Sequence, residues 1–162
     1  MTAEKARVPL KHTDRFFIYG QWVKPLTDDV IEVISPATED PYMKVAAASV
    51  ADIDRAVDAA RRAFDEGPWP RMSHAERASY LKKIADKLDE RAEDVALIWP
   101  NEMGIVHSLA RSHASMVSGI YRYYAGLGKR FPFEEEHRTF SGAKVGLLVR
   151  EPVGVVGAII PW

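Results

Sequence analysis

The 162-residue chain contains no cysteine, so disulfide bonds, a thiol nucleophile and thiolate metal sites are all excluded within it. An excess of one charge is also missing. The 22 lysine and arginine residues face 23 aspartate and glutamate residues, which leaves a formal net charge of -1. No overall field therefore favours nucleic acid, a membrane surface or an acidic substrate as the partner.

Long apolar runs are missing as well. No stretch approaches the roughly 20 apolar residues that a membrane-spanning helix needs. The polar residues 1–11 lack the apolar core of a signal peptide, so we expect a cytoplasmic protein. Residues 1–15 show no periodicity, which predicts a mobile leader.

Aromatic and β-branched residues are concentrated in two short segments after this leader. Residues 16–23 form the first segment and residues 30–34 the second, and the turn-like stretch 24–29 separates them. This spacing predicts an antiparallel strand pair. A third strand is expected over residues 43–47.

Two helices carry clear start signals. Ser49 with Asp52, and Ser73 with Glu76, have the spacing of N-terminal capping boxes. The first helix is expected to stop at Gly67 and to face inward along one apolar stripe. That stripe consists of Ile53, Val57, Ala60 and Phe64. The inward residues expected for the second helix are Tyr80, Leu81, Ile84, Ala85 and Leu88.

The next helical region is bounded by a proline and a glycine. Apolar periodicity continues through Val95 and Ile98 to Pro100, a residue disfavoured in helix interiors, and Gly104 supplies a stop. A further long helix is expected from about residue 107 to residue 129. Its tyrosines and Met116 are more typical of a core than of a pocket wall.

The C-terminal region begins with a charged run and ends with an apolar one. Residues 134–138 are predicted to be a solvated connector, and residues 144–149 begin an extended segment that Pro152 interrupts. Residues 153–162 form an unbroken apolar run, which is typical of a core strand in a parallel α/β sheet. Such a strand needs neighbours on both sides, so the chain reads as a truncated one.

Gly154-x-x-Gly157 has the outward form of a dinucleotide fingerprint. Phosphate-binding glycines lie in the turn between a strand and a helix, whereas these two lie inside the apolar run. Close backbone packing is therefore the favoured interpretation. The histidines lack metal-ligand spacing apart from the exposed segment 134–138. Spacing alone predicts no reaction and no metal-catalytic site.

Several local patterns resemble segments of the NAD(P)-dependent aldehyde dehydrogenase family. Residues 17–22 resemble the family's opening strand and turn, and residues 35–38 resemble its Asn-Pro-Ala-Thr segment. Residues 67–72 match the loop between its first two helices. Residues 150–162 match, almost letter for letter, the segment that leads into its Pro-Trp-Asn motif. The resemblance covers nearly the whole chain after Arg15.

The resemblance implies an α/β fold, namely the N-terminal part of the aldehyde dehydrogenase fold, truncated before the catalytic domain. This part would contain a β-hairpin, helices and the first strand of a Rossmann-like parallel sheet. The implied divisions are a leader (1–15), the N-terminal part of the NAD(P)-binding domain (16–133), an oligomerisation arm (134–152) and the first Rossmann-like strand (153–162). The complete protein would be a homo-oligomer, either a dimer or a tetramer.

The chemistry of that family is aldehyde oxidation. A cysteine forms a thiohemiacetal with the aldehyde, hydride passes to NAD or NADP, and a glutamate-activated water releases the acid. None of the catalytic side chains falls within this chain, so we expect the isolated chain to be inactive. The alternative is a non-catalytic assembly or binding module derived from the same fold. The exposed edges of a strand at 153–160 argue against that alternative.

Eight positions carry site roles by the same resemblance. The positions that would line the cofactor site are Ile159, Ile160, Pro161 and Trp162. Ser112 and Met116 match helix positions that face the substrate tunnel, and Val33 and Glu102 match a peripheral monovalent-cation site.

Overall fold

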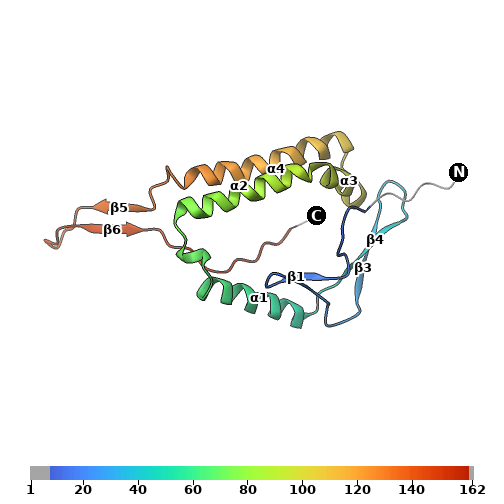
Figure 1. Cartoon of the computed structure of the whole chain (residues 1–162), viewed down its shortest axis with the longest axis horizontal. Coiled ribbons are helices and arrows are strands. Elements are labelled where there is room, and N and C mark those ends of the chain that lie inside the picture. Colours follow the sequence, from blue (N-terminus) through green and yellow to red (C-terminus); the bar gives the residue numbers. More distant parts are fainter. Residues whose placement is uncertain (1–7, 161–162) are drawn as a thin grey trace.

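The computed structural model describes residues 8–160, which form four α-helices, one short 3-10 helix and three separate strand pairs. The strands are β1 (Phe16–Ile18), β2 (Gln21–Val23), β3 (Val30–Ile34), β4 (Pro41–Ala46), β5 (Glu134–His137) and β6 (Gly146–Val149). The helices are α1 (Val50–Asp65), η1 (Trp69–Arg71), α2 (His74–Glu90), α3 (Ala92–Met103) and α4 (His107–Leu127). In Figure 1, α2, α3 and α4 lie together on one side, and α1 lies with β1 on the other. The expected α/β class is confirmed.

The first strands pair differently from the sequence prediction. β1 pairs with β2 and β3 pairs with β4, each antiparallel, so residues 16–23 form their own hairpin and do not pair with residues 30–34. The cause is the turn at Tyr19 and Gly20, whose φ angles are 51° and 76°. Two left-handed residues match the twist of a tight hairpin. The expected third strand is present as β4, paired with β3.

Both predicted capping boxes are confirmed. Ser49 Oγ accepts a hydrogen bond from the Asp52 backbone N–H at 3.3 Å, and the Asp52 carboxylate accepts from the Ser49 N–H at 3.1 Å. Ser73 and Glu76 make the same reciprocal pair at 3.2 and 2.8 Å. Each cap satisfies backbone donors that the helix itself leaves free, which stabilises a helix by about 1 kcal/mol.

Pro100 lies inside α3 and does not end it, which differs from the prediction. Its position in the last turn limits the damage, because the helix has few further hydrogen bonds to lose. The Asn101 side chain donates to Leu97 O at 2.8 Å and satisfies a carbonyl in that turn. The stop at Gly104 is confirmed, with φ of 79° and its N–H bonded to Pro100 O at 3.0 Å.

The best-packed region lies where α4 crosses α2 and α3. Small residues form this contact: Ala85, Ala96 and Ala110 are fully buried, and Ser118 is nearly so. Their size lets the helix backbones approach closely. At the rim, the Arg122 guanidinium donates to two aspartates of α2, Asp86 and Asp89, at 2.7 Å each. The long helix predicted from about residue 107 is confirmed as α4.

The apolar stripe expected to point inward from α1 is largely exposed. Ile53 and Val57 are 54% and 50% exposed, and Tyr80 and Ile84 of α2 are 44% and 42% exposed. Burial was therefore correctly predicted for Ala85 but wrong for these four residues. The described part of the chain brings no second layer against these faces.

Residues 134–138 are not a connector, which corrects the prediction. Residues 134–137 form β5, which pairs with β6 from Glu134 opposite Val149 to His137 opposite Gly146. Figure 1 shows this hairpin extending away from the helices. Both faces of such a hairpin reach water, so a charged sequence is compatible with a strand.

The strand predicted at 153–162 is absent from its described residues, 153–160. A strand requires a partner for its backbone N–H and C=O groups, and none of the described segments pairs with this one. Gly154 also takes a φ of 108°, and Val153 is 93% exposed. Pro161 and Trp162 lie outside the described residues.

Part of the predicted mobile leader is held against the body. Residues 1–7 lie outside the described residues. In the remainder, Pro9 O accepts a hydrogen bond from Arg91 at 3.0 Å, and Thr13 O accepts from the Ala46 N–H at 2.8 Å. The His12 ring lies 4.5 Å from the Trp22 ring, measured between centroids.

Candidate functional site

The two predicted substrate-tunnel residues lie on one exposed face of α4. Ser112 and Met116 are four positions apart, which places them one above the other on a helix. Met116 is 62% exposed. The Trp99 ring meets the His113 ring edge-on at 6.0 Å beside this face. The predicted pair is therefore together, on a surface that has an apolar side chain and a hydroxyl.

The predicted cation-site residues lie where the end of α3 meets β3. Partial burial raises the pKa of the Glu102 carboxyl. Burial, and then the negative charge of Glu102, raise the pKa of the Tyr42 phenol, so these two groups face a common region. Val33 is half-buried in β3 and pairs with Met43 of β4.

The surroundings of this region include an unsatisfied oxygen. Ser35, directly after β3, is 4% exposed, and its Oγ has no hydrogen-bond partner. A Cβ built on Gly104 would lie 3.1 Å from Pro36, so the end of α3 packs directly on this segment. Oxygen ligands suit hard cations. Among the residues that the structure describes, no group of three or more His, Asp or Glu side chains could hold a metal ion.

Of the four predicted cofactor residues, the two that the structure describes supply only apolar side chains. Ile159 and Ile160 are 95% and 79% exposed on an extended segment. Pyrophosphate binding requires backbone N–H groups in a strand-to-helix turn. The described residues around Gly154 and Gly157 form no such turn. The described part of this segment therefore offers an apolar surface and no such turn.

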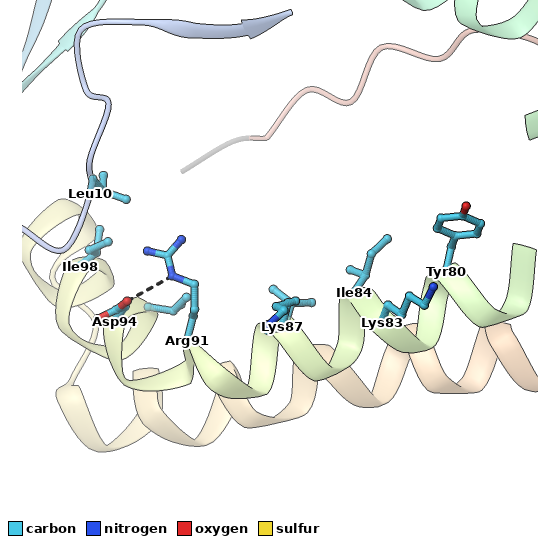
Figure 2. A pocket seen from close by; sticks show the side chains of 10 residues that line it. Leu10, Tyr80, Lys83, Ile84, Lys87, Arg91, Asp94 and Ile98 are labelled. Carbon is cyan, nitrogen blue, oxygen red and sulfur yellow. Dashed lines mark hydrogen bonds and ion pairs between the residues drawn. The ribbon is translucent and has the colours of Figure 1, made fainter. Parts of the chain in front are cut away.

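An apolar groove runs along α2 and α3, as Figure 2 shows. Its volume is about 490 Å³. Tyr80 and Ile84 point into it from α2, and Leu10 faces it from the N-terminal segment. The Arg91–Asp94 ion pair, at 3.2 Å, stands at one end. The lining also includes the amines of Lys83 and Lys87, but most of it is apolar, so the groove is suited to contact with an apolar partner.

A second, larger cavity of about 670 Å³ lies at the base of the β5–β6 hairpin. Rings from three parts of the chain line it, among them Trp69, Tyr124 and Phe133, together with the guanidinium groups of Arg77 and Arg150. Of the eight predicted site residues, none of the six that the structure describes lines either cavity. The structure does not bring the tunnel, cofactor and cation positions together into one site.

Sequence reasoning recognised Asp52 as a cap but missed its second role. Asp52 is 1% exposed and also accepts hydrogen bonds from the Leu26 N–H, at 3.2 Å, and from Arg55, at 3.2 Å. Burial alone would raise the pKa of Asp52, but the bonds from Ser49 and Leu26 and the charge of Arg55 outweigh it and lower that pKa. Asp52 thereby ties the β2–β3 connection to α1. No local pattern marks Leu26 as its partner.

Comparison with known proteins gives a consistent picture. The model of the aldehyde dehydrogenase family matches residues 22–162. "Aldehyde dehydrogenase 1" of Tanacetum cinerariifolium is 37% identical, over 91% of this chain and 30% of that protein. "NADP/NAD-dependent aldehyde dehydrogenase PuuC" of Escherichia coli is 36% identical, over 92% of this chain and 30% of that protein.

Solved structures agree with these relatives. A Mycobacterium tuberculosis aldehyde dehydrogenase complexed with NAD+ gives a TM-score of 0.78 at 37% identity and covers 86% of this chain and 29% of that one. A betaine aldehyde dehydrogenase mutant from Staphylococcus aureus, in complex with NAD+, gives a TM-score of 0.82 at 28% identity. The match covers 89% of this chain and 29% of that one. The chain spans about 30% of the length of the curated relatives it matches. No described helix is long and apolar enough to cross a membrane.

Proposed function

The chain belongs to the aldehyde dehydrogenase family as its N-terminal portion, and on that premise we propose that the whole protein oxidises an aldehyde to a carboxylic acid with NAD or NADP. The observation that carries this proposal is the agreement of sequence and fold over one region. The family model matches from residue 22 to residue 162, and the fold matches an NAD+-bound relative with a TM-score of 0.78.

In this proposal the described residues have supporting roles. Bound NAD or NADP supplies the hydride acceptor. Ile159 and Ile160, with Pro161 and Trp162, form an apolar wall against that cofactor, and Ser112 and Met116 form part of the wall that guides the aldehyde. The nucleophilic cysteine and the basic glutamate come from outside this chain, which has no cysteine. The isolated chain should therefore show no turnover.

A chimera tests this proposal. Residues 1–160 would replace the matching part of the Escherichia coli relative, which is 36% identical to this chain. We expect aldehyde-dependent reduction of NAD or NADP, measured by the absorbance of the reduced cofactor. The isolated 162-residue chain, assayed in parallel, should give none. The matched control is the same chimera with its catalytic cysteine changed to serine.

The chimera also defines what would contradict the proposal. A folded chimera with the circular dichroism spectrum of the relative but without turnover on any aldehyde tested would overturn it. Turnover that persists in the serine control would exclude the thiohemiacetal route. A change of KM for the aldehyde in Met116→Ala, with KM for the cofactor unchanged, would support the tunnel assignment.

The same premise supports a homo-oligomer, a dimer or a tetramer, joined through residues 134–152. The support is the β5–β6 hairpin, which extends from the body and exposes 59% of Leu147 and 46% of Leu148. Light scattering on the chimera should give a mass that is a multiple of one chain. Deletion of residues 138–145, the tip of the hairpin, should reduce that mass if the arm makes the contact.

We extend the proposal to a monovalent cation held near Val33 and Glu102. The unsatisfied Ser35 Oγ and the partly buried Glu102 carboxylate favour an oxygen-liganded ion there. Potassium should raise the melting temperature of the parent chain but not that of Glu102→Gln. An equal rise in both would exclude Glu102 as a ligand.

A second candidate is a non-catalytic assembly or binding module. The observation in its favour is the β5–β6 hairpin, which extends away from the helices. This candidate predicts that the isolated chain is a folded, monodisperse assembly and that the chimera stays inactive. Aggregation of the isolated chain, combined with an active chimera, would exclude it.

A further inference from the structure

The arm, residues 134–149, is fastened to the body by a cluster of rings and guanidinium groups. We call it the arm-base cluster, and its members are His74, Arg77, Phe131, Phe133 and Arg150. His74 is the first residue of α2, and Phe133 directly precedes β5. Their rings stack with centroids 3.6 Å apart and planes 11° from parallel. The contact joins the residue directly before the arm to a helix terminus that is far away in sequence.

Arg77 fixes the orientation of the His74 ring. Its Nη2 lies 2.9 Å from His74 Nδ1. A guanidinium can only donate, so Nδ1 accepts, and the ring proton of a neutral His74 lies on Nε2. The other terminal nitrogen of Arg77 donates to Met72 O at 2.6 Å and to Trp69 O at 3.1 Å. The guanidinium is thus held by the loop before α2, and it holds the imidazole in turn.

Arg150 ties the two strands of the arm together on the other side of Phe133. Its backbone N–H donates to Phe133 O at 2.9 Å, and its guanidinium donates to Pro132 O at 2.7 Å. The guanidinium also pairs with Glu135 at 2.5 Å and lies 5.3 Å from the centre of the Phe131 ring. Entry and exit of the arm therefore meet at one point.

Beyond its base the arm has little other support. The main contacts of β5 and β6 are with each other, and Phe140, in the loop that joins them, is fully exposed. An isolated two-stranded hairpin is only marginally stable in water. The stacked ring pair and the backbone around it must therefore determine which way the arm points.

We infer that His74 is a positioning residue that fixes the direction of the arm relative to α2. Without the imidazole ring, Phe133 loses its stacking surface and Arg77 loses one of its three acceptors, while the helices keep their own contacts. The arm then swings about residues 130–133. The consequence for subunit association rests on the proposed role of the arm, but the positioning of the arm itself does not.

Distance measurement between two spin labels tests this inference directly. The chain has no cysteine, so two introduced cysteines are its only labelling sites. Ser141→Cys labels the arm tip, and Lys82→Cys labels the exposed face of α2. In the parent background we expect one narrow distance peak by double electron–electron resonance. His74→Ala should lose that peak and give a broad distribution.

Two matched variants separate positioning from stability. His74→Phe keeps a ring that can stack on Phe133, so it should restore the narrow peak. Tyr80→Ala removes a ring from the same helix that contacts Trp69 and not the arm, so it should leave the peak unchanged. Circular dichroism melting of each variant reports whether the helices remain folded. A purely structural role of His74 would change the melting curve and not the distance distribution.

Each outcome decides the question. A narrow peak in His74→Ala, with helices folded, overturns the inference, and so does a broad distribution in the parent. Should His74→Ala unfold, Phe133→Leu removes the stack from the arm side and must broaden the distribution. A narrow parent peak without any self-association would count against the arm as the joining element while leaving the role of His74 intact.

Discussion

The α2–α4 interface and the α1 face both have apolar residues at helical spacing, but only the interface buries them. In the first, alanines and a serine are buried, with Ala85 and Ala110 at 0% exposure. In the second, Ile53 and Val57 stand at the same helical spacing and remain about half exposed, at 54% and 50%. Periodicity therefore shows which side of a helix is apolar, but it does not show whether this chain covers that side.

The size of the side chains explains part of this difference. Helices whose facing residues are small can pack directly on each other, as α2 and α4 do. Branched side chains such as Ile53 need a wide surface opposite them. Burying one such side chain contributes about 1.5–3 kcal/mol, which is a large fraction of a small domain's stability. The α1 face is therefore where added contacts would change stability most.

The largest effect is expected from overfilling the α2–α4 interface. Ala85→Leu places extra carbon atoms at a site with 0% exposure, so we expect a loss of about 1–3 kcal/mol in the free energy of unfolding. Ala60→Leu, on the exposed face of α1, should stay within about 0.5 kcal/mol. Urea unfolding measures both. Equal losses would contradict the contrast between the two regions.

Removal of the two helix caps should destabilise different parts of the chain. Ser73→Ala removes the cap of α2 and should lower global stability by about 1 kcal/mol, because α2 is packed into the main core. Ser49→Ala removes an equivalent cap from α1, which makes few contacts and should open locally. Native-state hydrogen exchange distinguishes the two. The contrast fails if the Ser49 variant accelerates exchange in α4 as much as in α1.

Acid should loosen α1 before it affects the main core. The pKa of Asp52 is lowered from its ordinary value of 3.8 in the folded chain. A carboxyl whose pKa is lowered by folding stabilises the folded chain above the pKa that it has in the unfolded chain. That stabilisation is lost as pH falls through the pKa of the folded chain. Hydrogen exchange in α1 should therefore speed up in this acid range, and Asp52→Asn should remove the pH dependence. The exposed Asp58→Asn is the control and should leave it unchanged.

The smallest effect on stability is expected at Glu102, and its pH dependence is opposite in sign to that of Asp52. Partial burial raises the pKa of Glu102 from 4.5. This carboxyl therefore contributes to the free energy of unfolding below the pKa that it has in the unfolded chain, and the contribution is lost as pH rises through the pKa that it has in the folded chain. Without added potassium, Glu102→Gln should match or slightly exceed the parent at neutral pH, within about 0.5 kcal/mol. Melting temperatures at neutral and acidic pH measure this. A clearly lower melting temperature at neutral pH would contradict it.

Local signals were the part of the fold that the sequence predicted well. The caps at Ser49 and Ser73 and the glycine stop at Gly104 depend on hydrogen bonds between near neighbours, which sequence spacing determines. The turn at Tyr19 escaped prediction because tyrosine rarely takes a left-handed φ. The strand at residues 134–137 escaped because three consecutive glutamates suggest a solvated loop.

The candidate site residues were predicted by resemblance to the family, and their roles stay predictions. Ser112 and Met116 fall on one face because they are four residues apart. The proximity of Glu102 to Tyr42 and the stacking of His74 on Phe133 depend on how distant segments dock, which no local pattern encodes. The terminal segment 153–160 failed as a strand for a related reason, because strand pairing is a property of two segments and not of one.

The register of the arm has an electrostatic consequence. Glu134 lies opposite Val149 and Glu136 lies opposite Leu147, so two carboxylates and two aliphatic side chains share one face. Two arms laid together through this face would bring four negative charges into a surface that excludes water, which is costly unless cations accompany them. This face of the arm therefore disfavours contact with the same face of a second arm, and it should prefer a basic or neutral surface. High salt would weaken that discrimination.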